Sequence, residues 1–158
     1  MLRLSGEALV AITLTDNDAR QQLFGRIVDL NATYGPGPLK VLWEGIPDEV
    51  PASDPVVPWL RVALRFATGN QRTFGASSHR VYQRRGILGV QIFTPMGTNN
   101  PVLADTLVTL FRDGLESTQF TKGLILRNIR RVGGGPDPAG GPWTINLIQA
   151  DFEFDALN

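Results

Sequence analysis

The chain has 158 residues, 42% of them hydrophobic and 19% charged, which is enough to build one core and indicates a single domain spanning residues 1–158. Its 15 basic and 15 acidic residues cancel, which argues against a protein whose main task is to wrap nucleic acid. Cysteine is absent, which excludes disulfides, thiolate metal sites and cysteine nucleophiles. No apolar run approaches the roughly 20 residues of a membrane-spanning helix, and the start lacks the pattern of a signal peptide.

The first predicted element is a helix over residues 16–33. Residues 15–18 (TDND) offer N-cap side chains, and apolar residues recur after them at helical spacing. Glycines and prolines at 34–38 end this helix. The apolar run 39–43 predicts an edge strand, which leads into a proline-rich extended loop.

Two strands are predicted next. Residues 59–67 alternate between apolar and polar side chains, as a half-buried strand does. In residues 81–94 both alternating sets contain apolar side chains, which predicts a central strand buried on both faces. Gly86 and Gly89 within it indicate a bulge or a close approach of another backbone. Between these strands, residues 72–76 are compatible with a hairpin partner.

A second helix is predicted from Asn100 to Glu116, because Asn100 and the proline after it provide an N-cap and a first turn before apolar residues at helical spacing. Strands at 124–132 and 143–154 follow, joined by a Gly/Pro-rich hairpin loop over 133–142. Direct links between strands favour antiparallel pairing. We therefore expect an α+β fold, in which a mostly antiparallel sheet packs against two helices.

Three segments, in this order along the chain, resemble the phage tail terminator-like family. They are residues 58–62 (PWLRV), 86–98 (GILGVQIFTPMGT) and 143–147 (WTINL). The resemblance covers residues 15–155 and leaves 1–14 as an N-terminal extension. It implies a structural protein of the virion and no enzyme, with neither cofactor nor metal.

The resemblance further implies a tail terminator, which forms a hexameric ring on the tail tube, stops tube polymerisation and provides the attachment surface for the head and neck. The implied partners are further copies of the chain, the tail tube protein, a neck or connector protein and, transiently, DNA in the channel, but no membrane. The protein would be assembled in the host cytoplasm and lie at the head-proximal end of the tail. A neck, head-completion or minor tail protein is the nearest alternative, and a small ligand-binding module or enzyme is a more remote one.

Charged residues are the first candidates for functional contacts. Arginines gather in two segments and three carboxylates alternate along the last strand: Arg80, Arg84, Arg85, Arg127, Arg130, Arg131, Asp151, Glu153 and Asp155. The arginines could pair with carboxylates of an adjacent subunit, or line a channel through which DNA passes. The carboxylates could alternatively bind a cation. A solvated outer face is the favoured interpretation for the carboxylates and a further alternative for the arginines.

The glycine-rich loop is the second candidate. Gly133, Gly134 and Gly135 are not followed by the Lys-Ser or Lys-Thr of a phosphate loop, which argues against nucleotide binding. Together with Asp137 they would reach a neighbouring subunit or ring, or form a mobile tip. His79 is the only histidine of the chain, so a histidine metal site or a Ser-His-Asp triad would depend on it, and a surface histidine is the favoured interpretation.

Overall fold

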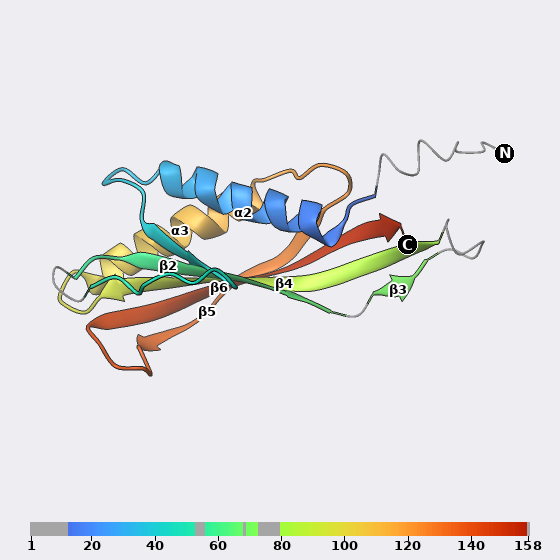
Figure 1. Ribbon diagram of the computed structural model, residues 1–158. Coiled ribbons are helices and arrows are strands. Elements are labelled where there is room, and N and C mark those ends of the chain that lie inside the picture. Colours follow the sequence, from blue (N-terminus) through green and yellow to red (C-terminus); the bar gives the residue numbers. More distant parts are fainter. Residues whose placement is uncertain (1–12, 53–55, 68, 73–79, 158) are drawn as a thin grey trace.

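The structure is a computed structural model that describes residues 13–52, 56–67, 69–72 and 80–157. In this part of the chain, two helices lie on one side of a six-stranded sheet (Figure 1). The arrangement confirms the predicted α+β fold. In chain order the elements are α2 (Asp16–Ala32), β1 (Lys40–Trp43), β2 (Trp59–Phe66), β3 (Asn70–Gln71), β4 (Val81–Pro95), α3 (Asn100–Glu116), β5 (Ile125–Pro136) and β6 (Trp143–Leu157).

The sheet has the strand order β1-β2-β4-β6-β5, and the short β3 pairs with the start of β4. The long strands β4 and β6 pair antiparallel over their whole length, from Val81 opposite Leu157 to Pro95 opposite Trp143. On either side of them, β2 and β5 are also antiparallel to their neighbours. Among the described strands only β1 is parallel to its neighbour, because the proline-rich segment after it carries the chain back before β2 begins.

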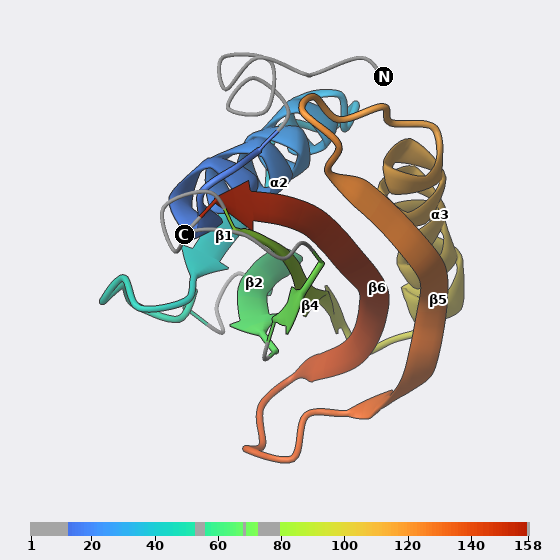
Figure 2. The ribbon, with the colours of Figure 1, turned by 90° about the vertical axis from the view of Figure 1, so that its right-hand side faces the viewer.

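The sheet is strongly curved, and both helices lie on its convex side (Figure 2). Alternate residues of the central strands point toward the helices and are fully buried, among them Leu88 of β4 and Ile148 of β6. They pack against buried residues of both helices, such as Leu23 of α2 and Phe111 of α3. Removal of this apolar surface from water is the main force that holds the two layers together.

The other side of β4 is buried at Phe93 and near the start of the strand but exposed in its middle, so the prediction of a strand covered on both faces holds only in part. Ile87 is 41% exposed on that side, and Arg85 two residues before it is also exposed. Within the described ranges no second layer lies over this side of the sheet. The sequence pattern shows that both sides of the strand carry apolar side chains. Whether another layer covers a side depends on where the other elements pack, which the pattern does not show.

One of the two glycines of β4 marks a close approach. A Cβ atom at Gly86 would collide with the carbonyl oxygen of Arg65 and with the ring of Phe152. At Gly89 the nearest atoms to a Cβ lie at 3.8 and 4.0 Å, which is ordinary contact. The expected close approach is therefore present at Gly86 and absent at Gly89.

The two helices begin in different ways. A capping box starts α2: the Thr15 hydroxyl accepts a hydrogen bond from the Asp18 N–H, and the Asp18 carboxylate accepts one from the Thr15 N–H, both at 3.1 Å. In α3 the N-cap is Asn99 and not Asn100, whose side chain instead donates to the Thr94 hydroxyl at 2.8 Å. Asn100 thus ties the start of α3 to the end of β4. Neither helix of the described residues is long and apolar enough to cross a membrane.

The glycine-rich segment forms a shorter loop than the sequence indicated. Strand β5 continues to Pro136, so Gly133, Gly134 and Gly135 belong to the strand, and only residues 137–142 form the tip of the β5–β6 hairpin. Gly133 has a φ of +61°, and it lies at one of two register shifts between β5 and β6. Glycine adopts this left-handed conformation without strain, so the bulge is accommodated and strand pairing continues.

The expected hairpin partner before β4 is described only in part. The two residues of β3 pair with β4, and the Arg72 N–H donates to the carbonyl of Val81 at 2.7 Å. Residues 73–79, and His79 with them, lie outside the described residues.

Candidate functional site

The uncovered, concave side of the sheet is the candidate functional site. We call it the open face: the side of β2, β4, β5 and β6 that points away from α2 and α3. Two hollows of about 640 and 650 Å³ lie on it and meet at Ile87, which lines both. A third hollow, of about 430 Å³, shares Arg61 and Gln91 with the first. The open face is therefore a continuous trough along the sheet.

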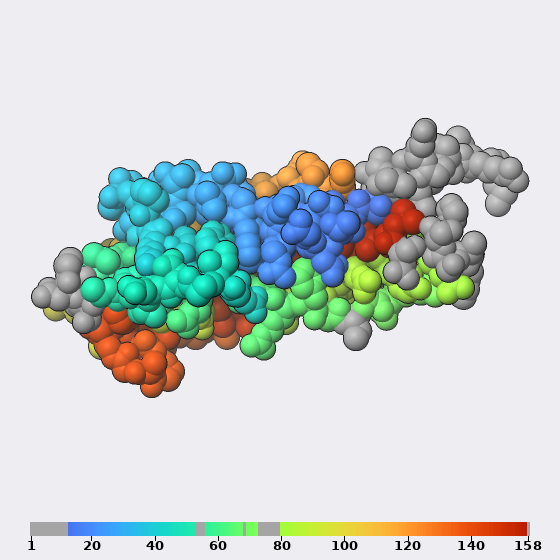
Figure 3. Space-filling view, in the orientation of Figure 1, coloured from blue at the N-terminus to red at the C-terminus, as the bar shows by residue number. Residues whose placement is uncertain are grey.

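Aromatic side chains close one end of the trough. Trp59 and Phe93 stack with ring centroids 3.7 Å apart, and Trp143 packs edge-on against Trp59 at 5.9 Å. All three are buried, so they form a second, smaller core on this side of the sheet. The hairpin tip, residues 137–142, lies at the same end and projects to the side away from the helices (Figure 3). Its turn is stabilised by Asp137, whose carboxylate accepts the Ala139 N–H at 3.0 Å.

Two arginines of β2 occupy the middle of the trough. The guanidinium of Arg61 lies 5.4 Å from the ring centroids of Trp59 and Phe93, at cation–π distance. Arg65 lies four residues further along the same side of the strand and is exposed. Neither arginine forms an ion pair with any residue that the structure describes.

Carboxylates on the wall beside β1 are already engaged. The Glu44 carboxylate accepts the Leu64 N–H at 2.9 Å, and Asp48 forms an ion pair with Lys40 at 3.2 Å. Hydrogen bonds from the Glu49 N–H and from the Lys40 ammonium group lower the pKa of Asp48. Glu44 lines the same hollow as Arg61 and Arg65, but neither it nor Asp48 forms an ion pair with these arginines.

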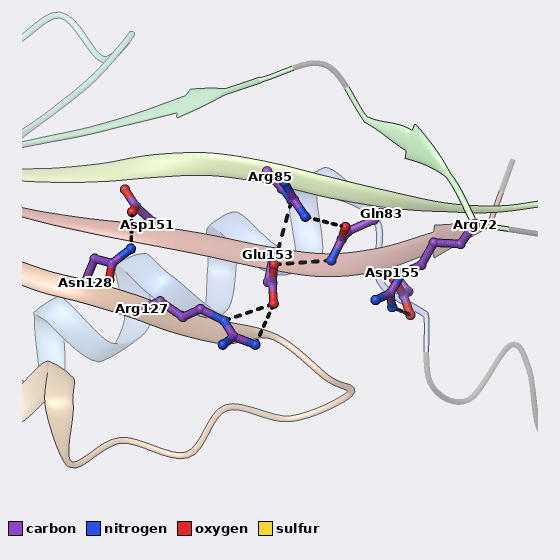
Figure 4. A network of polar contacts seen from close by, with 8 residues as sticks. All are labelled: Arg72, Gln83, Arg85, Arg127, Asn128, Asp151, Glu153 and Asp155. Carbon is purple, nitrogen blue, oxygen red and sulfur yellow. Dashed lines mark hydrogen bonds and ion pairs between the residues drawn. The ribbon is translucent and has the colours of Figure 1, made fainter.

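A network of ion pairs and hydrogen bonds fills the other end of the trough, with Glu153 at its centre (Figure 4). One carboxylate oxygen of Glu153 accepts from Nη2 and Nε of Arg127, at 2.9 and 3.0 Å. The other accepts from Nε2 of Gln83 at 3.2 Å and lies 3.8 Å from Nε of Arg85. Arg85 in turn donates to Oε1 of Gln83 at 2.8 Å. Two arginines thus share one carboxylate.

Two further carboxylates of β6 flank Glu153. Both oxygens of Asp155 lie 3.1 Å from Nη1 of Arg72. Asp151 accepts a hydrogen bond from the side chain of Asn128 at 2.8 Å and lies 3.7 Å from Arg130. Asn128 has a φ of +51°, which suits the register shift of β5 at this point, since asparagine tolerates the left-handed region.

The structure divides the arginines that the sequence singled out. Arg85, Arg127 and Arg130 meet Asp151 and Glu153, and they do so within one chain. By contrast, Arg131 points toward the helices and contacts Asp105 of α3 at 2.6 Å. Two more members lie elsewhere. Arg84 stands opposite the buried Phe154 on the helix-facing side of β4, and Arg80 precedes that strand.

Three participants were not singled out from the sequence: Arg72, Gln83 and Asn128. Gln83 was accessible to such reasoning, because it lies two residues before Arg85 and therefore points to the same side of the strand. Arg72 and Asn128 gave no such signal, since their positions depend on the pairing of β3 with β4 and on the shifted register of β5.

The charged groups of the open face are mainly carboxylates and arginines that contact one another. Among the described residues no group of three histidine, aspartate or glutamate side chains could hold a metal ion. The carboxylates of β6 accept hydrogen bonds from arginine and amide groups of the same chain. The expected alternative of cation binding by Asp151, Glu153 and Asp155 therefore finds these oxygens occupied by protein donors.

Comparison with known proteins identifies a fold and no family. No protein-family model matches the chain, and no curated protein matches it. Among 23 matching chains of solved structures, one that carries only a sequence identifier as its name covers 89% of this chain and 96% of its own length. It superposes with a TM-score of 0.57 at 21% sequence identity. The chain therefore shares its α+β fold with a solved protein of similar extent.

Proposed function

We propose that the protein is a structural subunit of a bacteriophage virion, a tail terminator that forms a ring, caps the tail tube, stops its polymerisation and offers an attachment surface to the head and neck. The resemblance of residues 58–62, 86–98 and 143–147 to the terminator-like family supports the assignment. The α+β fold is the one that this resemblance implies.

The observation that carries the proposal is the broad open face of the sheet. A side of four strands that the described chain leaves uncovered, with hollows and charged groups along it, is a surface suited to contact with another macromolecule. The carboxylates and arginines at its charged end hold each other in place, so they present a preorganised surface. An assembly protein needs complementary surfaces and no reacting group, and a contact that repeats around a ring is multiplied by its symmetry.

Two other functions remain candidates. A neck, head-completion or minor tail protein would use the same kind of surface at a different place in the virion. A small ligand-binding module is favoured by the hollows of about 640 and 650 Å³, which lie within the size range of small-molecule sites, roughly 300–1,000 Å³. Both hollows are open troughs on a sheet, whereas such sites usually enclose most of their ligand.

The mass of the purified protein in solution tests the proposal. Light scattering across a concentration series should show a species of about six times the 17.3 kDa of the chain, and electron microscopy should show it as a closed ring. Addition of these rings to polymerising tail tube protein of the same phage should shorten the tubes. Rings that leave tube length unchanged would favour the neck or minor tail alternative. A strict monomer that also leaves tube length unchanged would contradict the terminator function.

A further inference from the structure

The helix layer carries an excess of negative charge. In α2 there are three acidic side chains and two arginines, and in α3 there are three acidic side chains and one arginine, a net charge of −3. Asp16, Asp29 and Glu116 are exposed and form no ion pair with the described residues. The arginines Arg20 and Arg26 are engaged on the inner side, over the ring of Phe66 and at the end of α3.

The open face carries the opposite excess. Arg61 and Arg65 have no carboxylate partner among the described residues, and Arg85 and Arg127 share the single carboxylate of Glu153. An anionic surface placed on the trough would meet these guanidinium groups directly. Opposite excess charge on the two sides of one molecule favours a contact between the helix layer of one copy and the open face of another.

Shape and apolar surface agree with the charges. The helices lie on the convex side of the curved sheet and the trough on its concave side (Figure 2). Each helix of 17 residues is about 25 Å long, and a strand of 15 residues is about 50 Å long, so the helix pair fits within the length of the trough. Exposed valines of the helix layer, Val28 at 51% and Val102 at 71%, would meet Ile87 and Val132, each 41% exposed, on the open face.

We propose that the helix layer of one copy packs into the open face of the next copy. The contact joins two different surfaces, so a copy that uses one of them still offers the other to a further copy. Such head-to-tail contacts close into a ring when the rotation between copies permits. This inference rests on the proposed function, because it names the surfaces through which the ring would form. It places Arg61 and Arg65 between subunits and not on the wall of an open channel.

Two charge-reversal variants test the contact. The face variant, Arg65→Glu, places a negative charge in the trough. The helix variant combines Asp29→Arg with Glu116→Arg. All three side chains are exposed and unpaired within the described chain, so each variant should fold. A matched control reverses a charge outside both surfaces: Glu49→Arg in the segment after β1.

Light scattering at a concentration where the wild type forms rings should find each variant at the mass of a monomer, while the control forms rings. An equimolar mixture of the two variants should assemble again into species of higher mass than either variant forms alone. The face variant keeps an intact helix layer and the helix variant keeps an intact open face, so these two surfaces can make the native contact. The two altered surfaces also carry opposite charges, so they can meet as well, and assembly can continue in the mixture.

The possible failures are distinguishable. Rings of wild-type size from either variant alone would overturn the contact and leave the terminator function standing. A mixture that stays monomeric would show that the two surfaces do not meet, and would also overturn it. A wild type that stays monomeric throughout would overturn the contact between copies in solution. Assembly through these surfaces without any effect on tail tubes would count against the terminator function alone.

Discussion

At the scale of single residues, the two glycines of β4 show that a glycine within a strand can mark a close approach or have only ordinary contacts. Gly86 and Gly89 lie on the same strand, three residues apart, and both suggested a close approach. At Gly86 the backbone of a neighbouring strand and a buried ring occupy the space that a side chain would need, and at Gly89 they do not. The difference arises from Arg65 and Phe152, which are brought to Gly86 by pairing with β2 and β6.

Replacement of these glycines by alanine tests that difference. Gly86→Ala should lower the free energy of unfolding by about 1–3 kcal/mol, because the added methyl group forces the backbone of β2 or the ring of Phe152 to move. Gly89→Ala should change it by less than about 1 kcal/mol, and in the stabilising direction, since alanine suits a strand better than glycine does. Urea unfolding of both variants would measure this. Equal effects at the two positions would contradict the packing at Gly86.

At the scale of elements, the two helices illustrate what local sequence can and cannot specify. The capping box of α2 involves only residues 15–18, the stretch in which the sequence indicated N-cap side chains. The N-cap of α3 is Asn99 and not Asn100, whose side-chain amide donates to the hydroxyl of Thr94 and the carbonyl of Pro95 in the preceding strand. A contact with another element therefore overrides the local capping preference.

The capping box predicts a dependence of stability on pH. The pKa of Asp18 is lowered, first by the hydrogen bond from the Thr15 hydroxyl and then by that from the Thr15 N–H, below an ordinary value of 3.8. A carboxyl whose pKa is lower in the folded chain contributes stability above its unfolded pKa and loses it as the pH falls through the folded pKa. Asp18→Asn should therefore lower the urea midpoint at neutral pH, and the difference from wild type should shrink as the pH falls below 3.8.

Asp16→Asn is the matched control for this measurement. It removes a carboxylate from the same helix turn without removing a capping hydrogen bond. Its effect reports the general attraction between a negative charge and the helix start. If the two variants shift the urea midpoint equally at every pH, the capping box would not be the source of the stability.

At the scale of the whole molecule, the question is whether the charged residues of the open face pair within one subunit or between subunits. The sequence suggested that Arg127 and Arg130 pair with carboxylates of a neighbour. In the structure they contact Glu153 and Asp151 of their own chain, because β5 and β6 pair side by side as a hairpin. The groups left for a neighbour are Arg61 and Arg65, on another strand.

Glu153→Gln separates these two roles. Within one chain, loss of the carboxylate that two arginines share should lower the free energy of unfolding of the monomer by roughly 1 kcal/mol. Asp151→Asn, whose partner Arg130 lies at 3.7 Å, should change it by less than about 0.5 kcal/mol. Thermal unfolding of the dilute protein would measure both. An unchanged monomer combined with impaired assembly in Glu153→Gln would instead support pairing between subunits.

The sequence by itself determined the α+β class, both helices and the main strands, because helix caps and the alternation of strands arise from neighbouring residues. Tertiary structure decided the rest: which side of the sheet stays uncovered, which arginines face it, and that Gly133–Gly135 continue a strand. Those features depend on residues far apart in the chain, since a side chain's direction follows from strand register and its burial from the layer packed above it. Arg84 and Arg85 show the reason most simply, as adjacent residues of one strand point to opposite sides of the sheet.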